Sequence, residues 1–254
     1  MSTRHVLVTG AGTGIGRAIA IRQARDGATV GLVGLRADEL EETAAAIDGL
    51  THVAACDVRV REDVEAAFAT LAAAQGPIHA FVAVSGIGGG NGEDDEGGDR
   101  FDDLVRTNVN GTYYCVRGMM RHLAPGPDAR HVVVLSSILA RIAVPGYTGY
   151  SASKAGLLGL VRSLAAGLAP RGVQVNAICP GWVDTDMAWQ GLDAAAAEIG
   201  GTRQGAYRDA MKHVPLGRMS QPEDIAGTVA WLLSPDARGV TGQAIDQNGG
   251  AWTG

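Results

Sequence analysis

Aromatic residues and cysteines are scarce in this chain of 254 residues, at 5% aromatics and three cysteines, and no long run of basic residues occurs. Glycine, by contrast, occurs 37 times, and 46% of the residues are hydrophobic, which is enough for a sizeable core. Small residues allow helices to pack closely on a sheet. The composition therefore favours an α/β fold over an all-β sandwich.

The three cysteines, Cys56, Cys115 and Cys179, lie far apart in apolar stretches, and no pair has the spacing of zinc ligands. We expect reduced core thiols in a cytoplasmic protein, and no metal site. The net charge of -6 argues against nucleic acid or an anionic membrane as a partner, although it leaves room for one small basic pocket. No apolar run is long enough to cross a bilayer, and MSTRHVLVTG leads straight into an apolar strand, so neither a membrane span nor a signal peptide is expected.

Apolar, strand-like runs alternate with segments of helical period along the chain. Most of the runs are continuously apolar, as in strands that are buried on both faces of a parallel sheet. The predicted strands are 5–10, 28–34, 51–56, 78–84, 131–137, 173–178 and 242–247. The predicted helices are 14–26, 38–48, 61–75, about 100–123, 150–169 and 221–233. This alternation predicts one doubly wound, Rossmann-type α/β domain over 1–254, with a seven-stranded parallel sheet flanked by helices.

Two long connections stand out. The segment 86–99 is rich in glycine and acidic residues and is either a substrate loop or a solvated loop. The segment of about 182–217 follows the sixth strand and carries a short helix or two, and we expect a substrate loop or lid there. After it, Ser220 and Glu223 have the spacing of a capping box, with Pro222 in the first turn of the last helix.

A glycine-rich turn, TGAGTGIG, separates the first strand from the first helix. Its glycines permit a tight turn and let backbone N–H groups approach a pyrophosphate, and the helix N-terminus adds a favourable dipole. The spacing differs from the fingerprint GxGxxG, but the strand–turn–helix context is the same. A turn without a ligand is the alternative. The residues expected to contact a dinucleotide here are Gly10, Thr13, Gly14, Ile15 and Gly16.

The end of the second strand normally selects the cofactor, because an acidic residue there bonds the ribose 2′-OH of NAD. Here the strand ends in Gly34, Leu35 and Arg36, and no carboxylate stands at its tip. Arg36 has the donors to bind a 2′-phosphate bidentately. The sequence thus favours NADP(H) over NAD(H). The alternative is that Arg36 is a solvated arginine and Asp38 an ordinary first-turn acid.

Tyr150 and Lys154 lie four residues apart in YSASK, on one face of a predicted helix. A free phenol has a pKa of about 10, and an adjacent ammonium is expected to lower it. Tyr150 would then exchange a proton with a carbonyl oxygen near neutral pH. Ser137 ends a predicted strand and is expected at the same edge, where its hydroxyl bonds the reacting oxygen.

Together these motifs resemble the classical short-chain dehydrogenase/reductase family, and the resemblance covers essentially the whole chain. The matching segments are TGAGTGIG at 9–16, CDV at 56–58, NVNG at 108–111, SS at 136–137, YSASK at 150–154, NAICPGWVDTDM at 176–187 and VTGQAIDQNGG at 240–250. The resemblance implies a catalytic tetrad of Asn108, Ser137, Tyr150 and Lys154. In this family the lysine and the tyrosine also contact the cofactor, and the asparagine holds a water in a proton relay.

The resemblance also implies the remaining contacts. Asp57 and Val58 border the adenine, and one segment lies beside the nicotinamide and the phosphates, namely Pro180, Gly181, Val183 and Thr185. The family's NNAG motif is replaced here by AVSG at 83–86, so we expect changed hydrogen bonding around the cofactor contacts Ser85 and Gly86. The implied substrate pocket consists of Ile138, Leu139, Ile142, Met187 and Trp189.

This pocket indicates an apolar or cyclic ketone, and the GIGGG segment resembles polyketide ketoreductases, so a β-ketoacyl substrate is a further option. We expect an NADP(H)-dependent ketone reductase or secondary-alcohol dehydrogenase, with an NAD-dependent alcohol dehydrogenase as the alternative. A non-catalytic nucleotide-binding regulator conflicts with the intact tetrad, and an extended sugar-nucleotide epimerase needs a longer chain. The family and the widely apolar helices at 100–123 and 150–169 indicate a homo-oligomer, most simply a homotetramer.

Overall fold

The computed structural model describes residues 4–92, 98–126, 128 and 130–254. Its centre is a parallel sheet of seven strands in the order β3-β2-β1-β4-β5-β6-β7. The strands are β1 (His5–Thr9), β2 (Thr29–Gly34), β3 (Thr51–Ala55), β4 (Ala80–Ala83), β5 (Arg130–Leu135), β6 (Val173–Pro180) and β7 (Ala244–Gln247). The order reverses between β1 and β4, where ligands of such sheets bind at the carboxyl ends of the strands. The doubly wound fold predicted from the sequence is confirmed.

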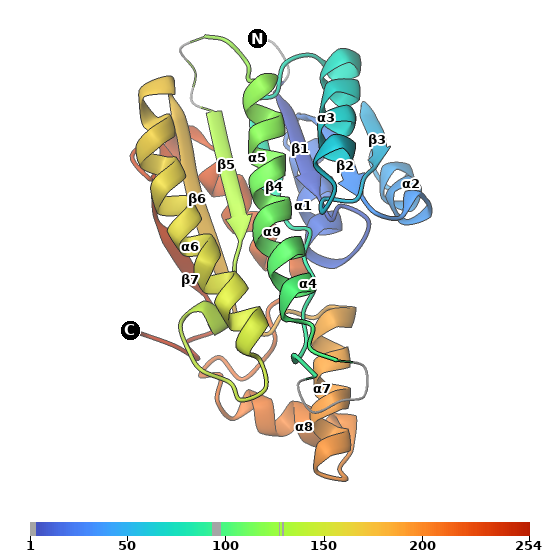
Figure 1. The fold of residues 1–254 in the computed structure, drawn as a ribbon, viewed down its shortest axis with the longest axis vertical. Helices are drawn as coiled ribbons and strands as arrows, with labels where there is room; N and C mark the ends of the chain where they lie inside the picture. The colour runs from blue at the N-terminus through green and yellow to red at the C-terminus, as the bar shows by residue number, and fades with distance from the viewer. Residues whose placement is uncertain (1–3, 93–97, 127, 129) are drawn as a thin grey trace.

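Helices cover both faces of the sheet, as Figure 1 shows. One face carries α3 (Arg61–Gln75), α5 (Thr112–Arg121) and α6 (Thr148–Leu168), and the other carries α1 (Gly14–Arg25), α2 (Ala37–Ala45) and α9 (Pro222–Leu232). Leu7 and Phe81 face the first layer and Val8 and Val82 face the second, and all four side chains are buried. Burial on both faces is the reason why the strands read as continuous apolar runs.

The prediction of one continuous helix at about 100–123 is wrong, because a π-helical turn interrupts it. The segment consists of α4 (Phe101–Val105), a π-helical turn (Arg106–Gly111) and then α5. Within this turn Gly111 lies against Val58, since a β-carbon added at residue 111 would come 2.8 Å from Cγ2 of Val58. The turn also contains Asn108, and π-turns inside helices occur frequently at functional sites.

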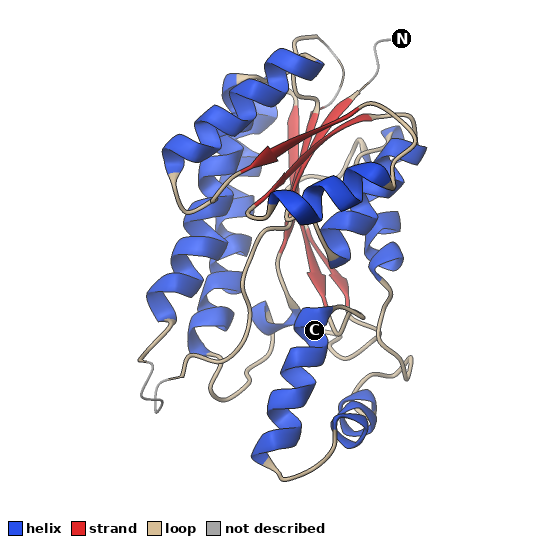
Figure 2. Cartoon of the chain, turned by 90° about the vertical axis from the view of Figure 1, so that its right-hand side faces the viewer, coloured by secondary structure: helices blue, strands red, loops and turns tan. Residues whose placement is uncertain are grey.

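The long connection after β6 folds as two helices, α7 (Asp186–Glu198) and α8 (Arg203–Met211), which have a small core of their own. Figures 1 and 2 show them beyond the carboxyl edge of the sheet. The predicted N-cap at Ser220 is wrong: Gln221 caps α9 and donates its N–H to Asp224. Ser220 instead pairs its backbone with the segment after β6, donating to Trp182 O at 2.9 Å and accepting from Asp184 N.

Short 3-10 turns follow β5 (Ile138–Ala140), α6 (Ala169–Arg171) and α9 (Pro235–Ala237). The three cysteines are free and buried, as predicted, and burial raises the pKa of each thiol. In the parts of the chain that the structure describes, no helix has the length and hydrophobicity to cross a membrane. Among the same residues no group of three His, Cys, Asp or Glu side chains is placed to hold a metal ion.

Candidate active site

The glycine-rich turn joins the carboxyl end of β1 to α1, and two of its glycines have positive φ, 65° at Gly10 and 48° at Gly14. A β-carbon at residue 16 would lie 2.0 Å from the carbonyl oxygen of Gly10, so Gly16 is required by the close packing of the turn itself. Gly14 differs, because a β-carbon there would meet Cγ2 of Thr185 at 3.1 Å. The turn therefore faces the segment that follows β6.

The first turn of α1 offers backbone donors to a ligand. Thr13 is the N-cap, in extended conformation, and its side chain makes no capping hydrogen bond. Arg17 N makes the first intrahelical bond, to Thr13 O at 3.1 Å. The N–H groups at 14–16 consequently lack intrahelical acceptors, and this turn holds no acidic residue. Both features suit the pyrophosphate of a nicotinamide dinucleotide.

Lys154 and Tyr150 project from the beginning of α6 toward the carboxyl end of β5. Nζ of Lys154 lies 5.6 Å from the ring centroid of Tyr150 and donates to Leu135 O at 2.9 Å. The lysine is buried, and burial lowers its pKa from 10.5 to about 8. A group with these properties is an ammonium that changes protonation within the working range of an enzyme.

The predicted fall in the pKa of Tyr150 is wrong for the chain without cofactor. Burial raises the pKa of the phenol above 10.0, and hydrogen bonding to Ser137 opposes this rise only in part. Ser137 itself follows β5, and its Oγ accepts from Leu139 N at 3.1 Å. The phenol is thus kept protonated and faces the serine, as a proton donor requires.

Asn108, in the π-helical turn, is buried and hydrogen-bonded on both sides of its amide. Its Oδ1 accepts from Ile87 N at 2.9 Å, and its Nδ2 donates to Ile87 O and to Ser153 Oγ. Ser153 in turn donates to the carbonyl of Tyr150 at 2.8 Å. These bonds connect the loop after β4, which carries AVSG in place of the NNAG motif, to α6.

The loop after β4 passes directly over these side chains. Thr9 Oγ1 receives hydrogen bonds from Val84 N at 3.1 Å and from Ser85 N at 3.3 Å. A β-carbon at residue 86 would lie 2.9 Å from Asn108 Oδ1 and 3.5 Å from Lys154 Nζ. Glycine at this position therefore keeps the space above the lysine open. Of the predicted substrate loop 86–99, residues 93–97 lie outside the described residues.

Gly88 lies between Met187 and the ring of Tyr150. A β-carbon there would meet Sδ of Met187 at 2.9 Å and Cε2 of Tyr150 at 3.7 Å. Met187 is 49% exposed, whereas Ile138 is buried and Leu139 and Ile142 are partly buried. Three of the five predicted pocket residues thus follow Ser137 within five positions of the sequence, and a fourth, Met187, lies across Gly88 from Tyr150.

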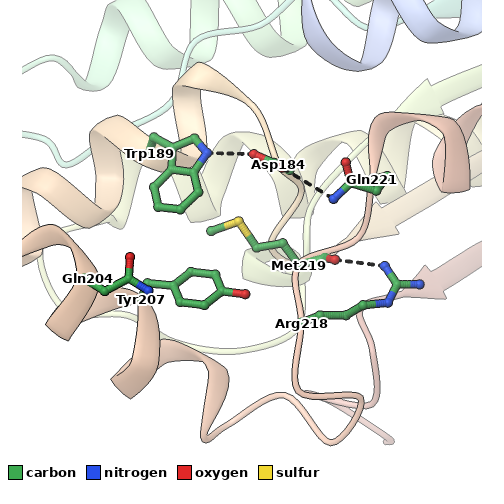
Figure 3. Close-up of a pocket in the computed structure, with 7 residues that line it drawn as sticks. All are labelled: Asp184, Trp189, Gln204, Tyr207, Arg218, Met219 and Gln221. Atoms are coloured by element: carbon green, nitrogen blue, oxygen red, sulfur yellow. Dashed lines mark hydrogen bonds between the residues drawn. The ribbon is translucent and has the colours of Figure 1, made fainter.

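Trp189, the fifth, participates in a separate cavity of about 330 Å³ between α7, α8 and the start of α9. Its indole donates to Asp184 at 2.7 Å and stacks on Tyr207, with 5.7 Å between the ring centroids. Figure 3 shows these side chains with Met219 between them and Arg218. None of the residues of the predicted tetrad, Asn108, Ser137, Tyr150 and Lys154, lines this cavity.

The segment after β6 is fixed by its own backbone. Gly181 N donates to Gln247 O at 3.1 Å, directly after Pro180 ends β6, and Val183 forms a β-bridge with Ser220. Thr185 caps α7, and its methyl group lies beside Gly14 of the glycine-rich turn.

The first turn of α2, shortly after β2, places two carboxylates beside Arg36. Arg36 is 61% exposed and forms ion pairs with Asp38 at 2.9 Å and with Glu39 at 3.3 Å. Glu39 also lies against the glycine-rich turn, since a β-carbon at Gly12 would come 3.1 Å from its Oε2. The prediction did not include Glu39, although its (i,i+3) spacing from Arg36 is visible in the sequence. Leu35 beside them is 68% exposed.

Asp57 and Val58 differ in accessibility. The hydrogen bonds from Arg59 lower the pKa of the Asp57 carboxyl, and its Oδ1 accepts from Arg59 N at 2.9 Å. Val58 is buried against the π-helical turn. Asp57 is thus partly exposed and offers a carboxylate beside the end of β3, whereas Val58 is not accessible.

Known proteins resemble this chain over nearly its full length. A protein-family model described as enoyl-(acyl carrier protein) reductase matches residues 10–251. The short-chain reductase protein NovJ of Streptomyces niveus is 36% identical over 247 residues, which cover 96% of this chain and 92% of that protein. The chain belongs to the short-chain dehydrogenase/reductase family. It is therefore an oxidoreductase of a family that uses nicotinamide cofactors.

Two further members of the family are similar. The 3-oxoacyl-acyl-carrier-protein reductase FabG of Staphylococcus aureus is 32% identical over 256 residues, which cover 98% of each chain. Among solved structures, a variant of actinorhodin polyketide ketoreductase with NADPH has a TM-score of 0.87 and 30% identity, and the match covers 98% of this chain and 97% of that one.

Proposed function

We propose that this short-chain dehydrogenase/reductase is an NADP(H)-dependent ketoreductase whose substrate is a 3-oxoacyl thioester or a related ketone. The observation that carries the proposal is the position of the Tyr150 phenol. It is protonated, faces Ser137 and Lys154, and lies at the same sheet edge as the uncapped first turn of α1. A proton donor beside a pyrophosphate site is the arrangement that carbonyl reduction needs.

Each residue then has a defined task. The free N–H groups at 14–16 and Thr185 hold the pyrophosphate, and Lys154 binds the ribose next to the nicotinamide. When bound, NADPH supplies the hydride. The hydroxyl of Ser137 orients the ketone oxygen, and Tyr150 donates its proton to that oxygen as negative charge develops there. The ammonium of Lys154 favours the phenolate that remains, and Asn108 fixes the backbone of α6 through Ser153.

The substrate class rests on the surroundings of Tyr150 and on the relatives. We infer an apolar approach to Tyr150 lined by Gly88, Met187 and Ile138, because the missing β-carbon of Gly88 leaves space between Met187 and the Tyr150 ring and Ile138 is buried directly after Ser137. The relatives named above include a 3-oxoacyl reductase and a polyketide ketoreductase, both of which act on ketones. We assign the segment 182–217, with α7 and α8, as the lid of this approach.

The preference for NADP(H) rests on Arg36 and on the absence of a carboxylate at the tip of β2. Asp38 and Glu39 compete with a 2′-phosphate for the arginine, so the preference is weaker than Arg36 alone would give. One observation favours an NAD-dependent secondary-alcohol dehydrogenase as the second candidate: the Glu39 carboxylate against Gly12 is an acceptor for a ribose hydroxyl.

We also propose that the enzyme is a cytoplasmic homotetramer. A groove between α5 and α6 is lined by apolar side chains with arginines at its rim, and a second copy of the chain would cover it. The apolar members of the groove are Val116, Met120, Leu160, Leu164 and Leu168.

The test is a steady-state assay of NADPH and NADH oxidation with two probes, the N-acetylcysteamine thioester of acetoacetate and a cyclic ketone. The proposal predicts faster turnover of the thioester and a higher kcat/KM with NADPH. Oxidation of a secondary alcohol with NAD and no reduction of the thioester would favour the second candidate. Nucleotide binding without turnover of any carbonyl or alcohol would indicate the regulator.

A further inference from the structure

Asn91, which follows the GIGGG segment, is a buried polar residue that none of the family motifs includes. It is 1% exposed. Its side-chain Oδ1 accepts a hydrogen bond from Gly149 N at 2.6 Å, and its backbone N donates to Gly146 O at 2.9 Å. Both partners lie in the segment that leads into Tyr150, so one residue of the loop after β4 is bonded twice to the start of α6.

The start of α6 needs such a partner. Tyr147 is the N-cap and supplies no side-chain acceptor, and Ser151 N makes the first bond of the helix, to Tyr147 O. The N–H groups at 148–150 therefore have no intrahelical acceptor. Asn91 provides one for Gly149, the residue directly before Tyr150. The acceptor that caps the first turn of α6 thus comes from a residue nearly sixty positions earlier in the sequence.

Gly149 has no room to move away from this cap. A β-carbon there would lie 3.0 Å from Asn91 Oδ1, 3.0 Å from Cδ1 of Leu104 and 3.2 Å from Cα of Phe101. The backbone on the N-terminal side of Tyr150 is therefore enclosed by α4 and by the asparagine together.

The amide of Asn91 has a single possible orientation in this network. Gly149 N is a donor, so the atom facing it is the oxygen, and the carboxylate of Asp99 accepts from Nδ2 at 3.1 Å. Asp99 Oδ1 also accepts from Phe101 N at 2.9 Å, and Arg100 N donates to Asn91 O. Every polar group of Asn91 is consequently in use.

Arg100, next to Asp99, also holds the loop after β4 in place over the Tyr150 ring. The guanidinium of Arg100 donates to Gly88 O and to Gly90 O, at 3.2 Å each. Gly88 is the residue whose missing β-carbon leaves space between Tyr150 and Met187. Asn91 is therefore bonded to the start of α6, which carries the Tyr150 ring, and belongs to the loop that lies over that ring.

We propose that Asn91 is a positioning residue for Tyr150, which caps the first turn of α6 and so fixes the phenol relative to Ser137 and Lys154. The inference rests on the proposed role of Tyr150 as proton donor. Replacement of Asn91 should leave cofactor binding unchanged, because none of the hydrogen bonds of Asn91 goes to the glycine-rich turn or to Lys154.

The first experiment replaces Asn91 with Ala in the full-length enzyme and measures kcat with the acetoacetyl thioester, together with the Kd of NADPH. We expect kcat to fall at least about tenfold, because displacement of a catalytic group by about 1 Å costs on the order of 100-fold. The Kd should change by less than about twofold. Asn176→Ala is the matched control: Asn176 is buried and bonded to Val240 O and Gln243 N, but it lies on β6.

A second readout does not need turnover. In enzyme labelled with 3-fluorotyrosine, the 19F resonance of Tyr150, assigned with Tyr150→Phe, should shift or broaden in Asn91→Ala and stay in place in Asn176→Ala. An unmoved resonance and a kcat within about threefold of wild type would overturn the inference. Absence of turnover in the wild type would refute the proposed function instead, and the resonance would still decide the role of Asn91.

If Asn91→Ala does not fold, the inference can be tested by exchanging the side chains of Asn91 and Asp99, which are bonded to each other. Asn91→Asp keeps the acceptor for Gly149 N but sets two carboxylates beside each other, so kcat should fall. Adding Asp99→Asn restores a donor opposite the new carboxylate and should recover at least about fivefold of that loss. A double variant no more active than Asn91→Asp would contradict the positioning role.

Discussion

The ammonium of Lys154 donates a hydrogen bond to the carbonyl oxygen of Leu135, the last residue of β5, at 2.9 Å. This bond holds the charge beneath Gly86 and beside the Tyr150 ring. A neutral carbonyl compensates a buried charge only in part, and for this reason burial lowers the pKa of Lys154 to about 8. The protonation of Lys154 should therefore set the pH above which the activity of the enzyme falls.

We expect kcat/KM for NADPH oxidation to fall as the pH rises through about 8, because this parameter follows the free enzyme, which then loses the Lys154 proton. The phenol contributes nothing in this range, since the pKa of Tyr150 lies above 10.0. In Lys154→Arg the guanidinium stays charged, so the inflection should disappear. A wild-type profile that is flat from about pH 7 to about 9.5 would contradict this assignment.

Tyr150→Phe should reduce kcat by at least about 10²–10⁴-fold, because it removes the proton donor and keeps the ring. NADPH affinity, measured by nicotinamide fluorescence, should stay near that of the wild type. Tyr147→Phe is the control, since its ring lies 6.5 Å from that of Tyr150 in an edge arrangement. Retention of more than about a tenth of kcat in Tyr150→Phe would mean that another group donates the proton.

Cofactor preference should respond in opposite directions to two neighbouring substitutions. Arg36→Ala removes a bidentate donor and should weaken NADPH binding by about tenfold while leaving NADH binding nearly unchanged. Glu39→Gln removes a competing carboxylate beside Gly12 and should tighten NADPH binding. Titrations of both nucleotides against both variants provide the check. Equal effects on NADPH and NADH would show that neither residue faces the 2′ position.

Stability should decline in acid through histidines at the amino-terminal edge of the sheet. His131 on β5 is buried, and burial lowers its pKa from 6.5 to about 4. The unfolded chain binds a proton there below pH 6.5 and the folded chain only near 4, so stability is complete above pH 6.5 and is lost as the pH falls between these values. His5 and His79, whose pKa values burial also lowers, act in the same direction.

Urea unfolding at several pH values measures this effect. The slope should approach about 1.4 kcal/mol per pH unit for each such histidine. His131→Phe should flatten the curve between about pH 6 and 4.5. Parallel curves for His131→Phe and wild type would assign the acid sensitivity elsewhere.

The oligomer proposal is tested by light scattering at micromolar concentration. We expect a mass four times that of the 26.1 kDa chain. Leu164→Glu places a charge in the groove between α5 and α6 and should give smaller species. Leu216→Glu, at a position that is 71% exposed and outside the groove, should remain tetrameric. A wild-type monomer would leave the groove leucines as an unexplained patch.

The strands could be predicted because the sheet is buried on both faces, so that runs such as 132–135 are continuously apolar. Tyr150 and Lys154 could be paired because helical periodicity alone sets their spacing. The π-helical turn could not, since its contacts, such as that of Gly111 with Val58, join segments distant in sequence. The direction of the Tyr150 pKa was missed for a similar reason: it depends on burial by segments distant in sequence. Ser220 satisfied the local rule for a cap, but its backbone pairs with the segment after β6.

The burial of the three cysteines has a practical consequence. Burial raises the pKa of Cys56 to about 12 and raises those of Cys115 and Cys179, so none of these thiols forms an appreciable amount of reactive thiolate at neutral pH. A single cysteine introduced at the surface will then be the preferred target of maleimide or spin-label reagents without removal of the native ones. Ile199→Cys, at the end of α7 and at a residue that is 70% exposed, would place a fluorophore on the segment 182–217 and report its movement when NADPH is added.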